Sequence, residues 1–424
     1  MTDSHFPSKV VITNCWSYYN KGDAAIAQST IRFIRDKNPD AEITLLAFDE
    51  QGFIKNRDKL DFVKVLPMPS INDSLRPLRI LSRLASSLGL EDLFGSVYLL
   101  LALTLLQPFK RFDRKLDSIL HAIETSELVI VVGGNYIYSH FGFYVHAIPI
   151  FYSKFVQKKV TIMLGHSIGP FKGTIVRIVS RYLLNQMDFI VFRERISHDY
   201  VKSNLQVKNP NMLTLCDMAF LLPSSTPKKS DSLRVGVTVR PWLFDEPSLY
   251  RQYIETITHV TIDLIKDGFE VYLIPFSYVR GSEDDLVTCK LIFTNLSKVY
   301  PERIFMIDVK EESPQSLTKI IGNLGLKILI ATRMHSAILS SLCAVPSVII
   351  SYQHPKAFGI SEQLELSTYV LRIEKLEPEL LTTTIKKLLN SDKAVENLVS
   401  AVKRLKDTNE PIITELFCRV LEFR

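Results

Sequence analysis

A cationic cluster follows an apolar stretch in the second half of the chain, where residues 328–335 read ILIATRMH. The apolar residues predict a buried strand, and Arg333 and His335 follow it where a helix pattern begins. In open α/β sheets ligands bind beyond the carboxyl ends of the strands, so a guanidinium and an imidazole here are suited to bind an anion. The alternative is that both side chains cap the strand and pair with nearby acids. This stretch alone leaves the two interpretations open.

Two other predicted strands of the second half also end in cationic or aromatic side chains. Arg240 follows the strand at 235–239, and Tyr352 and Lys356 follow the strand at 347–351. Because the carboxyl ends of parallel strands meet at one edge of a sheet, we expect these side chains to lie close to the first cluster. The sequence therefore predicts one anion-binding site formed by Arg240, Arg333, His335, Tyr352 and Lys356.

In the first half, a strand predicted at 9–14 leads into a Gly-containing loop and a helix predicted at 24–37. Asn20, Gly22 and Asp23 lie where this helix begins. Asp23 either faces a ligand or caps the helix, because aspartate is a favoured N-cap residue. Strand, loop and helix form the first half of a βαβ unit, which indicates a parallel sheet.

Two further strands of the first half, predicted at 128–132 and 160–164, end in residues suited to ligand binding or to tight turns. Glycine permits a close approach of the backbone, and loops at strand ends commonly carry functional side chains. The glycine pair lacks the additional glycine of a dinucleotide-binding fingerprint, so no Rossmann cofactor site is predicted. The residues concerned are Gly133, Gly134 and Asn135 after the first strand, and His166 and Ser167 after the second.

Two acids of the first half are candidates for proton transfer. Glu194 stands between Arg193 and Arg195 after a short predicted strand at 189–192, and such a cluster is either an internal salt-bridge network or part of a site. Asp217 either caps a turn or faces a cleft between the two halves of the chain. Residue types alone do not decide between these options.

An acidic run at 283–285 is either a metal ligand set or the start of a helix. Ser282 and Asp285 match a capping box, S-x-x-D, and acids are favourable in the first turn of a helix. The five cysteines are far apart, with no pair at zinc or redox spacing. We therefore expect neither a bound metal nor a cofactor.

Length and composition predict a large globular chain. Its 424 residues, 46% hydrophobic and 23% charged, suffice for about two to three domains. Strands alternate with helices through both halves, and the polar, Pro-containing stretch between them is typical of a linker. We predict two Rossmann-like α/β domains facing a cleft, a GT-B-like architecture. The predicted parts are an N-terminal domain at 1–224 with an apolar helical insertion near 75–112, a linker at 225–232, a C-terminal domain at 233–395 and a helical segment at 396–424.

Charge and targeting signals narrow the partners. The net charge of +6 is modest and no basic block dominates, so a nucleic-acid partner is not predicted. No secretory signal is visible, and the scattered cysteines fit a reducing compartment, so we expect a cytoplasmic protein. The run at 97–106 is shorter than the roughly 20 residues that a spanning helix needs. The 75–112 region is either a buried packing hairpin or a lid that rests on the inner face of a membrane. The sequence does not specify an oligomeric state.

Short motifs occur in a fixed order along the chain: NKGDAAI at 20–26, VVGGN at 131–135, GHSIGPF at 165–171, RE at 193–194, CDMAFLL at 216–222, TRMHSAILSSLCAVPSVIISY at 332–352, and Lys356 with Gly359. Each is degenerate alone, but their ordered combination resembles the polysaccharide pyruvyl transferase family. Two departures are Asn135, where a third glycine is common, and the enlarged apolar stretch near Val97.

The resemblance implies transfer of a pyruvyl group from phosphoenolpyruvate to two hydroxyls of a sugar, giving a cyclic ketal and phosphate. The phosphate and carboxylate of the donor would bind the cationic site of the second half. The acceptor would lie against the first half. It would be a polysaccharide or a lipid-linked glycan precursor of exopolysaccharide, capsule or cell wall. No step requires a metal or a cofactor.

Such a reaction needs an acid that protonates the enol carbon and a base that accepts a hydroxyl proton. His335 either binds phosphate or carries a proton. The other catalytic candidates are the carboxylates Asp23, Glu194 and Asp217. Two alternatives remain, a GT-B nucleotide-sugar glycosyltransferase and a non-catalytic glycan-binding subunit. The acceptor-binding residues that the resemblance implies are Asn20, Gly22, Asp23, Gly133, Gly134, Asn135, His166 and Ser167.

Overall fold

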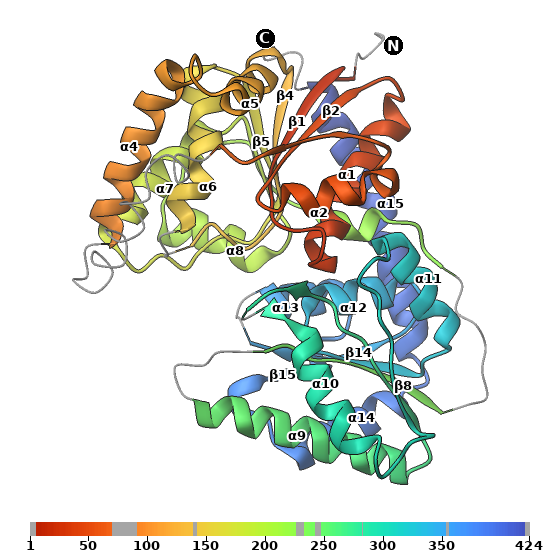
Figure 1. Ribbon diagram of the computed structural model, residues 1–424. Helices are drawn as coiled ribbons and strands as arrows, with labels where there is room; N and C mark the ends of the chain where they lie inside the picture. The colour runs from red at the N-terminus through yellow and green to blue at the C-terminus, as the bar shows by residue number, and fades with distance from the viewer. Residues whose placement is uncertain are drawn as a thin grey trace. The chain divides into compact units, whose positions relative to one another are not determined.

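The computed structural model describes residues 6–69, 91–138, 142–225, 233–241, 247–281, 283–352 and 356–419. The chain forms two compact units, each built on its own sheet (Figure 1). The first unit comprises Met1–Ser17, Thr30–Met218 and Asn409–Arg424, and the second comprises Tyr18–Ser29 and Ala219–Thr408. Each unit is thus made of separate segments of the sequence, whereas each predicted domain was one continuous range. The chain passes between the units four times, and two of these passages lie within the helices α1 (Lys21–Lys37) and α15 (Ala394–Arg419).

The first unit contains a seven-stranded sheet in the order β3-β2-β1-β4-β5-β6-β7. Every neighbouring pair is parallel. The strand order reverses between β1 and β4, a topological switch point of the kind at which doubly wound sheets bind ligands. The strands are β1 (Lys9–Cys15), β2 (Glu42–Ala47), β3 (Lys64–Pro67), β4 (Leu128–Val132), β5 (Val160–His166), β6 (Phe189–Phe192) and β7 (Met212–Thr214).

Helices pack against this sheet. Strands β4 and β5 are buried along their whole length, as continuous apolar strands in the middle of a parallel sheet should be. Helix α6 is buried along most of its length and contacts both β1 and α4. The described helices of this unit are α2 (Glu50–Lys55), α4 (Glu91–Phe109), α5 (Arg114–Thr125), α6 (Gly142–Phe151), α7 (Thr174–Gln186) and α8 (Arg195–Asp199).

The second unit contains a six-stranded parallel sheet in the order β12-β9-β8-β13-β14-β15. Its strands are β8 (Arg234–Thr238), β9 (Glu270–Leu273), β12 (Ile304–Met306), β13 (Ile328–Ala331), β14 (Ser347–Ser351) and β15 (Val370–Arg372). A two-stranded ribbon, β10 (Tyr278–Val279) with β11 (Glu283–Asp284), is antiparallel. The described helices are α9 (Pro247–Lys266), α10 (Asp285–Leu296), α11 (Pro314–Leu324), α12 (Met334–Ser341), α13 (Lys356–Gln363) and α14 (Pro378–Leu389).

The predicted α/β class and parallel sheets are confirmed. Strands β4, β6 and β14 have the predicted bounds, because each is an apolar run between turn residues. Residues 61–63 do not belong to β3. Asp61 and Phe62 have positive φ angles of 52° and 53°, which ordinary strands do not contain, so β3 begins at Lys64.

Two helix starts also differ from the prediction. Helix α1 begins at Lys21, and the Asn20 side chain accepts a hydrogen bond from the Gly22 N–H at 3.2 Å, so Asp23 lies in the first turn and is not the cap. The capping box predicted from Ser282 is wrong, because Asp284 caps α10 by accepting from the Leu286 N–H. Ser282 itself, residues 75–90 of the apolar insertion and residues 226–232 of the linker lie outside the described residues.

Candidate active site

Arg333 lies between β13 and α12, held from one side by a buried carboxylate. Its Nε donates to both Asp285 oxygens at 3.1 Å, and its Nη2 donates to Asp285 Oδ1 at 2.6 Å and to the Glu283 carbonyl at 3.0 Å. The Asp285 side chain is fully buried and that of Arg333 is 9% exposed. Nη1 has no hydrogen-bond partner within the described part of the chain. The guanidinium is therefore fixed on one edge, while the Nη1 edge remains for an anionic ligand.

Burial and charge act in opposite directions on this pair. Complete burial raises the pKa of the Asp285 carboxyl, and the attraction of Arg333 opposes that rise. Burial lowers the pKa of Arg333, but Asp285 outweighs this and raises it above its ordinary value. Arg333 is thus charged at every pH of interest, although its charge is largely balanced by its partner. Unbalanced positive charge in the site must come from other residues.

Two further cations, Arg240 and Lys356, lie around one aromatic ring. The Arg240 guanidinium carbon lies 4.1 Å from the centroid of the Tyr352 ring, and the Lys356 Nζ lies 5.4 Å from it. Burial raises the pKa of the Tyr352 phenol, but Lys356, Arg240 and Arg333 outweigh this and lower it from 10 to about 7. An environment that stabilises a phenolate also stabilises phosphate and carboxylate groups. The structure therefore brings Arg240, Arg333, Tyr352 and Lys356 together, as expected for an anion site.

His335 lies in the first turn of α12 and against Gly22 of α1. A β-carbon built on Gly22 would lie 2.1 Å from His335 Nδ1 and 2.6 Å from its Cγ, so only glycine leaves room for the imidazole. Asn20 and Asp23, on either side of this contact, are half-buried. These three residues were expected beside the other first-half candidates. They belong to the second unit, with the cationic cluster.

A chain of hydrogen bonds joins the same loop to Arg333. The Lys21 N–H donates to the Phe276 carbonyl at 2.8 Å. The Phe276 N–H donates in turn to Asp285 Oδ2 at 3.2 Å, and Asp285 holds Arg333. The start of α1 and the guanidinium are thus positioned by one continuous network.

Lys21, which the sequence interpretation overlooked, anchors the loop. Its side chain is fully buried. Its Nζ donates to the carbonyls of Lys310 at 2.6 Å and Glu312 at 2.9 Å, and it lies 4.8 Å from the centroid of the Tyr18 ring. A buried ammonium needs such partners, because desolvation alone would be costly. The available signal was its place inside the NKGD motif.

In the first unit, a buried polar cluster follows β5, β6 and β7. Arg193 Nη1 donates to Asp217 Oδ2 at 2.8 Å, and Arg193 Nε donates to Ser167 Oγ at 2.8 Å. All three residues are buried. The structure thus brings Ser167 and Asp217 together through Arg193, which the sequence left open as part of a salt-bridge network or of a site.

His166 is completely buried beside this cluster. Its Nε2 lies 3.0 Å from the Val131 carbonyl, which only accepts, so Nε2 carries the proton. Nδ1 has no hydrogen-bond partner among the described residues. Burial lowers the pKa of His166 to about 3. The imidazole is therefore neutral at physiological pH and has one unused acceptor.

The glycine pair after β4 packs against the end of β5. A β-carbon on Gly133 would lie 2.4 Å from the Gly165 carbonyl oxygen, so this position requires glycine. The Gly134 carbonyl accepts from the Ser167 N–H at 3.0 Å. Asn135 follows and is half-buried. The residues predicted after β4 and β5 therefore form one local group.

The two acids of the first unit have structural partners. Glu194 caps α8, because its carboxylate accepts from the Ser197 N–H at 2.8 Å and from the Ser197 hydroxyl. Asp217 pairs with Arg193. Both acids are fully buried, whereas Asp23 is half-buried. Asp23 lies in the second unit with His335, and the catalytic roles of all three carboxylates stay predictions.

An aromatic group near the carboxyl end of β1 was missed in the sequence. Trp16 is 37% exposed and its ring centroid lies 6.5 Å from that of His146. Phe48 and Tyr136 contact the same imidazole, with centroids at 4.7 Å and 4.2 Å. In the sequence, a tryptophan directly after a predicted strand was the indication of this aromatic group. Aromatic faces with one exposed member suit an apolar face of a sugar ring.

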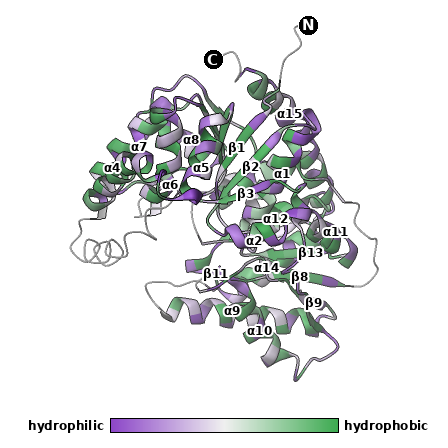
Figure 2. Ribbon diagram, turned by 45° about the horizontal axis from the view of Figure 1, so that its top comes forward, coloured by the Kyte–Doolittle hydropathy of each residue, from purple (hydrophilic) through white to green (hydrophobic). Residues whose placement is uncertain are grey.

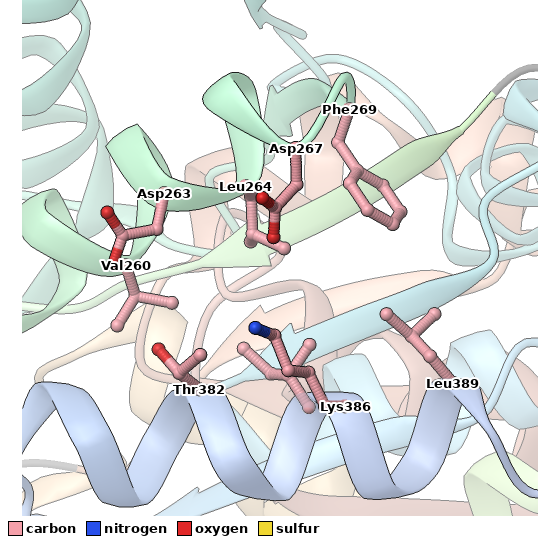
Figure 3. A pocket seen from close by; sticks show the side chains of 9 residues that line it. Val260, Asp263, Leu264, Asp267, Phe269, Thr382, Lys386 and Leu389 are labelled. Atoms are coloured by element: carbon pink, nitrogen blue, oxygen red, sulfur yellow. The ribbon is translucent and has the colours of Figure 1, made fainter.

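A hollow between α9 and α14 is too small to be the active site (Figure 3). Its volume of about 30 Å³ admits about two water molecules. Its walls are mainly apolar, with Asp263, Asp267 and Lys386 at the rim. Within the described residues no group of three histidine, cysteine or acidic side chains is placed to hold a metal ion.

Comparison with known proteins identifies the family. Residues 20–354 match the polysaccharide pyruvyl transferase family. This chain belongs to that family. The match spans the motifs at Asn20 to Asp23 and at Arg333 to His335, which the second unit brings together. The pyruvyl transferase is also 20% identical over 414 residues to the amylovoran biosynthesis protein AmsJ of Erwinia amylovora, with 92% of this chain and 94% of AmsJ covered. The chain is therefore a transferase enzyme of polysaccharide biosynthesis.

Solved structures of other enzymes share the fold. Anabaena HepE in complex with UDP-glucose superimposes with a TM-score of 0.57 at 12% identity over 99% of this chain and 100% of HepE. A UDP-N-acetylglucosamine 2-epimerase described as putative, from Listeria monocytogenes, gives 0.57 at 11% identity over 97% and 96%. Sucrose-phosphate synthase from Thermosynechococcus elongatus gives 0.55 at 9% over 98% and 100%. At these identities the similarity shows the GT-B fold alone.

Proposed function

We propose that the pyruvyl transferase takes phosphoenolpyruvate as its donor and forms a pyruvate ketal on a sugar of a polysaccharide or a lipid-linked glycan precursor. The observation that carries the proposal is the cluster of Arg240, Arg333 and Lys356 around Tyr352 in the second unit. Phosphoenolpyruvate is a small dianion or trianion with two separate anionic groups. A site that lowers a phenol pKa to about 7 has the positive potential that such a donor needs.

The cations have different tasks in this proposal. Arg333 is fixed by Asp285 and offers its Nη1 edge as a directed donor, which suits the planar geometry of a carboxylate or a phosphate oxygen. Arg240 and Lys356 supply the net charge. His335 either joins these anchors or carries a proton, and its contact with Gly22 fixes the position of its ring.

The reaction requires two proton movements. One sugar hydroxyl adds to C2 of the donor and loses its proton, while C3 gains a proton and becomes a methyl group. The second hydroxyl then adds to C2, the C–O bond to phosphate breaks, and the second proton leaves with the phosphate. His335 and Asp23 are the candidates for these steps, because both lie in the second unit with the cationic cluster. Neither of these proton transfers requires a metal when His335 and Asp23 carry them out.

The acceptor side belongs to the first unit in this proposal. The group formed by Gly133, Gly134, Asn135, His166 and Ser167 would hold the sugar hydroxyls. Trp16 extends it with an exposed aromatic face at the end of β1. The amylovoran biosynthesis relative supports a glycan acceptor. We place this acceptor among precursors of an exopolysaccharide, a capsule or the cell wall that are made in the cytoplasm.

The test supplies the purified enzyme with phosphoenolpyruvate and lipid-linked oligosaccharides and measures phosphate release. We expect release that depends on both substrates and is lost in Arg333→Ala. Matched reactions with UDP-sugars address the glycosyltransferase alternative, because release of UDP without consumption of phosphoenolpyruvate would overturn the proposal. Acceptor binding without turnover of either donor would favour a non-catalytic glycan-binding subunit.

A further inference from the structure

Helix α4 of the first unit is apolar around its whole circumference. No charged residue stands between Leu93 and Phe109. Figure 2 shows the helix mostly in the hydrophobic colour. Its inner side is buried in the core of the unit through Tyr98, Leu99 and Ala102. A helix without a polar side normally lies inside a protein or in a lipid environment.

The outer side of α4 is nevertheless exposed. Leu93 is 51% exposed, Val97 47%, Leu100 64% and Leu101 44%. These positions recur at intervals of three and four residues, so they form one strip along the helix. Only 28% of the stretch from Asp92 to Phe109 is buried. The strip therefore lacks the cover that the inner side has.

Helix α7 contacts α4 and also carries exposed apolar side chains. Ile178 is 63% exposed and Tyr182 is 53% exposed. Phe112, just beyond the carboxyl end of α4, is 87% exposed. Residues 91–117 and 172–186 carry seven basic and four acidic side chains, so the segments that include α4 and α7 have a net positive charge.

We propose that this α4–α7 surface docks on an anionic lipid bilayer, with α4 lying in the plane of the interface. Apolar side chains flanked by basic residues match the acyl region and the headgroups of such a membrane. The 18-residue stretch is about 27 Å long, close to the roughly 30 Å thickness of a hydrocarbon core. However, spanning would expose the packed inner side of α4 and empty the core of the unit, so the helix lies on the membrane.

A second copy of the chain fits this surface less well. A two-fold contact places the same patch of both copies face to face. The positively charged segments of the two copies would then be adjacent, where like charges repel. A bilayer with anionic headgroups has the complementary charge.

The experiment is flotation of the full chain with vesicles of phosphatidylcholine, alone or mixed with phosphatidylglycerol. We expect binding to the mixed vesicles that weakens with salt, and a bound fraction at least about tenfold smaller for Leu93→Glu/Leu100→Glu. The matched control is Val287→Glu/Leu291→Glu on α10, where the parent side chains are 62% and 48% exposed. This control should bind like the parent chain.

Circular dichroism and light scattering of both double variants complete the test. A folded Leu93→Glu/Leu100→Glu chain that floats as the parent does would overturn the proposal. The proposal would also be overturned if the parent chain did not bind vesicles but formed a dimer, and if Leu93→Glu/Leu100→Glu abolished that dimer. Arg111→Glu/Arg114→Glu should reduce binding to the mixed vesicles only, and equal binding to both vesicle types would contradict the charge argument.

Discussion

Donor binding should be coupled to protonation of Tyr352. In the free enzyme the Tyr352 phenol has a pKa of about 7, because Lys356, Arg240 and Arg333 favour the phenolate over the opposing effect of burial. Phosphoenolpyruvate brings its negative charges to the same cations. The pKa of the phenol should then return toward 10, and the phenolate must take up a proton when the donor binds.

The magnitude follows from this pKa. A phenol with a pKa of 7 is about 90% ionised at pH 8 and about 10% ionised at pH 6, so donor binding should take up about 0.9 proton at pH 8 and about 0.1 at pH 6. By linkage, the apparent affinity for phosphoenolpyruvate should fall about tenfold between pH 6 and pH 8. The sign is fixed, because the phenolate competes with the donor.

Calorimetric titration with phosphoenolpyruvate in two buffers of different ionisation enthalpy measures the proton uptake. Tyr352→Phe is the matched control, since it keeps the ring against which Arg240 lies but has no titrating hydroxyl. Protons taken up by the donor itself contribute equally in both proteins. The difference in proton uptake between them therefore reports the Tyr352 phenol alone. Equal proton uptake by the parent chain and Tyr352→Phe at pH 8 would contradict this prediction. So would a ratio of their two affinities for phosphoenolpyruvate that is the same at pH 6 and pH 8.

Three further predictions concern single side chains. Gly22→Ala should displace the His335 ring and lower kcat strongly with little change in the circular dichroism spectrum, and an unchanged kcat would contradict the contact. Asp285→Ala leaves Arg333 without its buried counter-ion and should cost about 3–5 kcal/mol in the denaturant-induced unfolding of the second unit. Asp199→Ala, which breaks an exposed pair, is its control and should have no measurable effect. For His166, the native pKa of about 3 lies below the unfolded value near 6.5, so stability falls as the pH drops from 6.5 toward 3. The stability penalty of His166→Gln should therefore be about 2 kcal/mol smaller at pH 5 than at pH 7, and a penalty independent of pH would contradict the neutral imidazole.

The sequence predicted most of the parallel strands and the cationic cluster for a common reason. Buried strands of a parallel sheet are apolar runs, and the residues after them meet at one edge by topology alone. Arg240, Tyr352 and Lys356, which are more than 100 residues apart at the extremes, could be grouped on that basis. Helix starts were less certain, since Asn20 and Asp23 are both good caps and only the local hydrogen bond selects Asn20.

Long-range pairing was beyond the sequence. Asp285 looks like an ordinary acid at a helix start, and its pairing with Arg333, 48 positions away, is set by packing. The assignment of Tyr18–Ser29 to the second unit has the same cause. It depends on backbone contacts such as that between Lys21 and Phe276, which leave no periodic signal. The cap that Glu194 forms with Ser197 was likewise not evident from the sequence, because only the folded backbone shows it.

The central claim is that this pyruvyl transferase moves the three-carbon group of phosphoenolpyruvate onto a sugar. The most direct measurement uses phosphoenolpyruvate labelled with ¹³C at C3, a lipid-linked oligosaccharide and heavy water, followed by nuclear magnetic resonance of the product glycan. We expect a labelled methyl group that carries one deuterium on the acceptor, together with one phosphate released per methyl formed. Consumption of a UDP-sugar with the label still in phosphoenolpyruvate would contradict it.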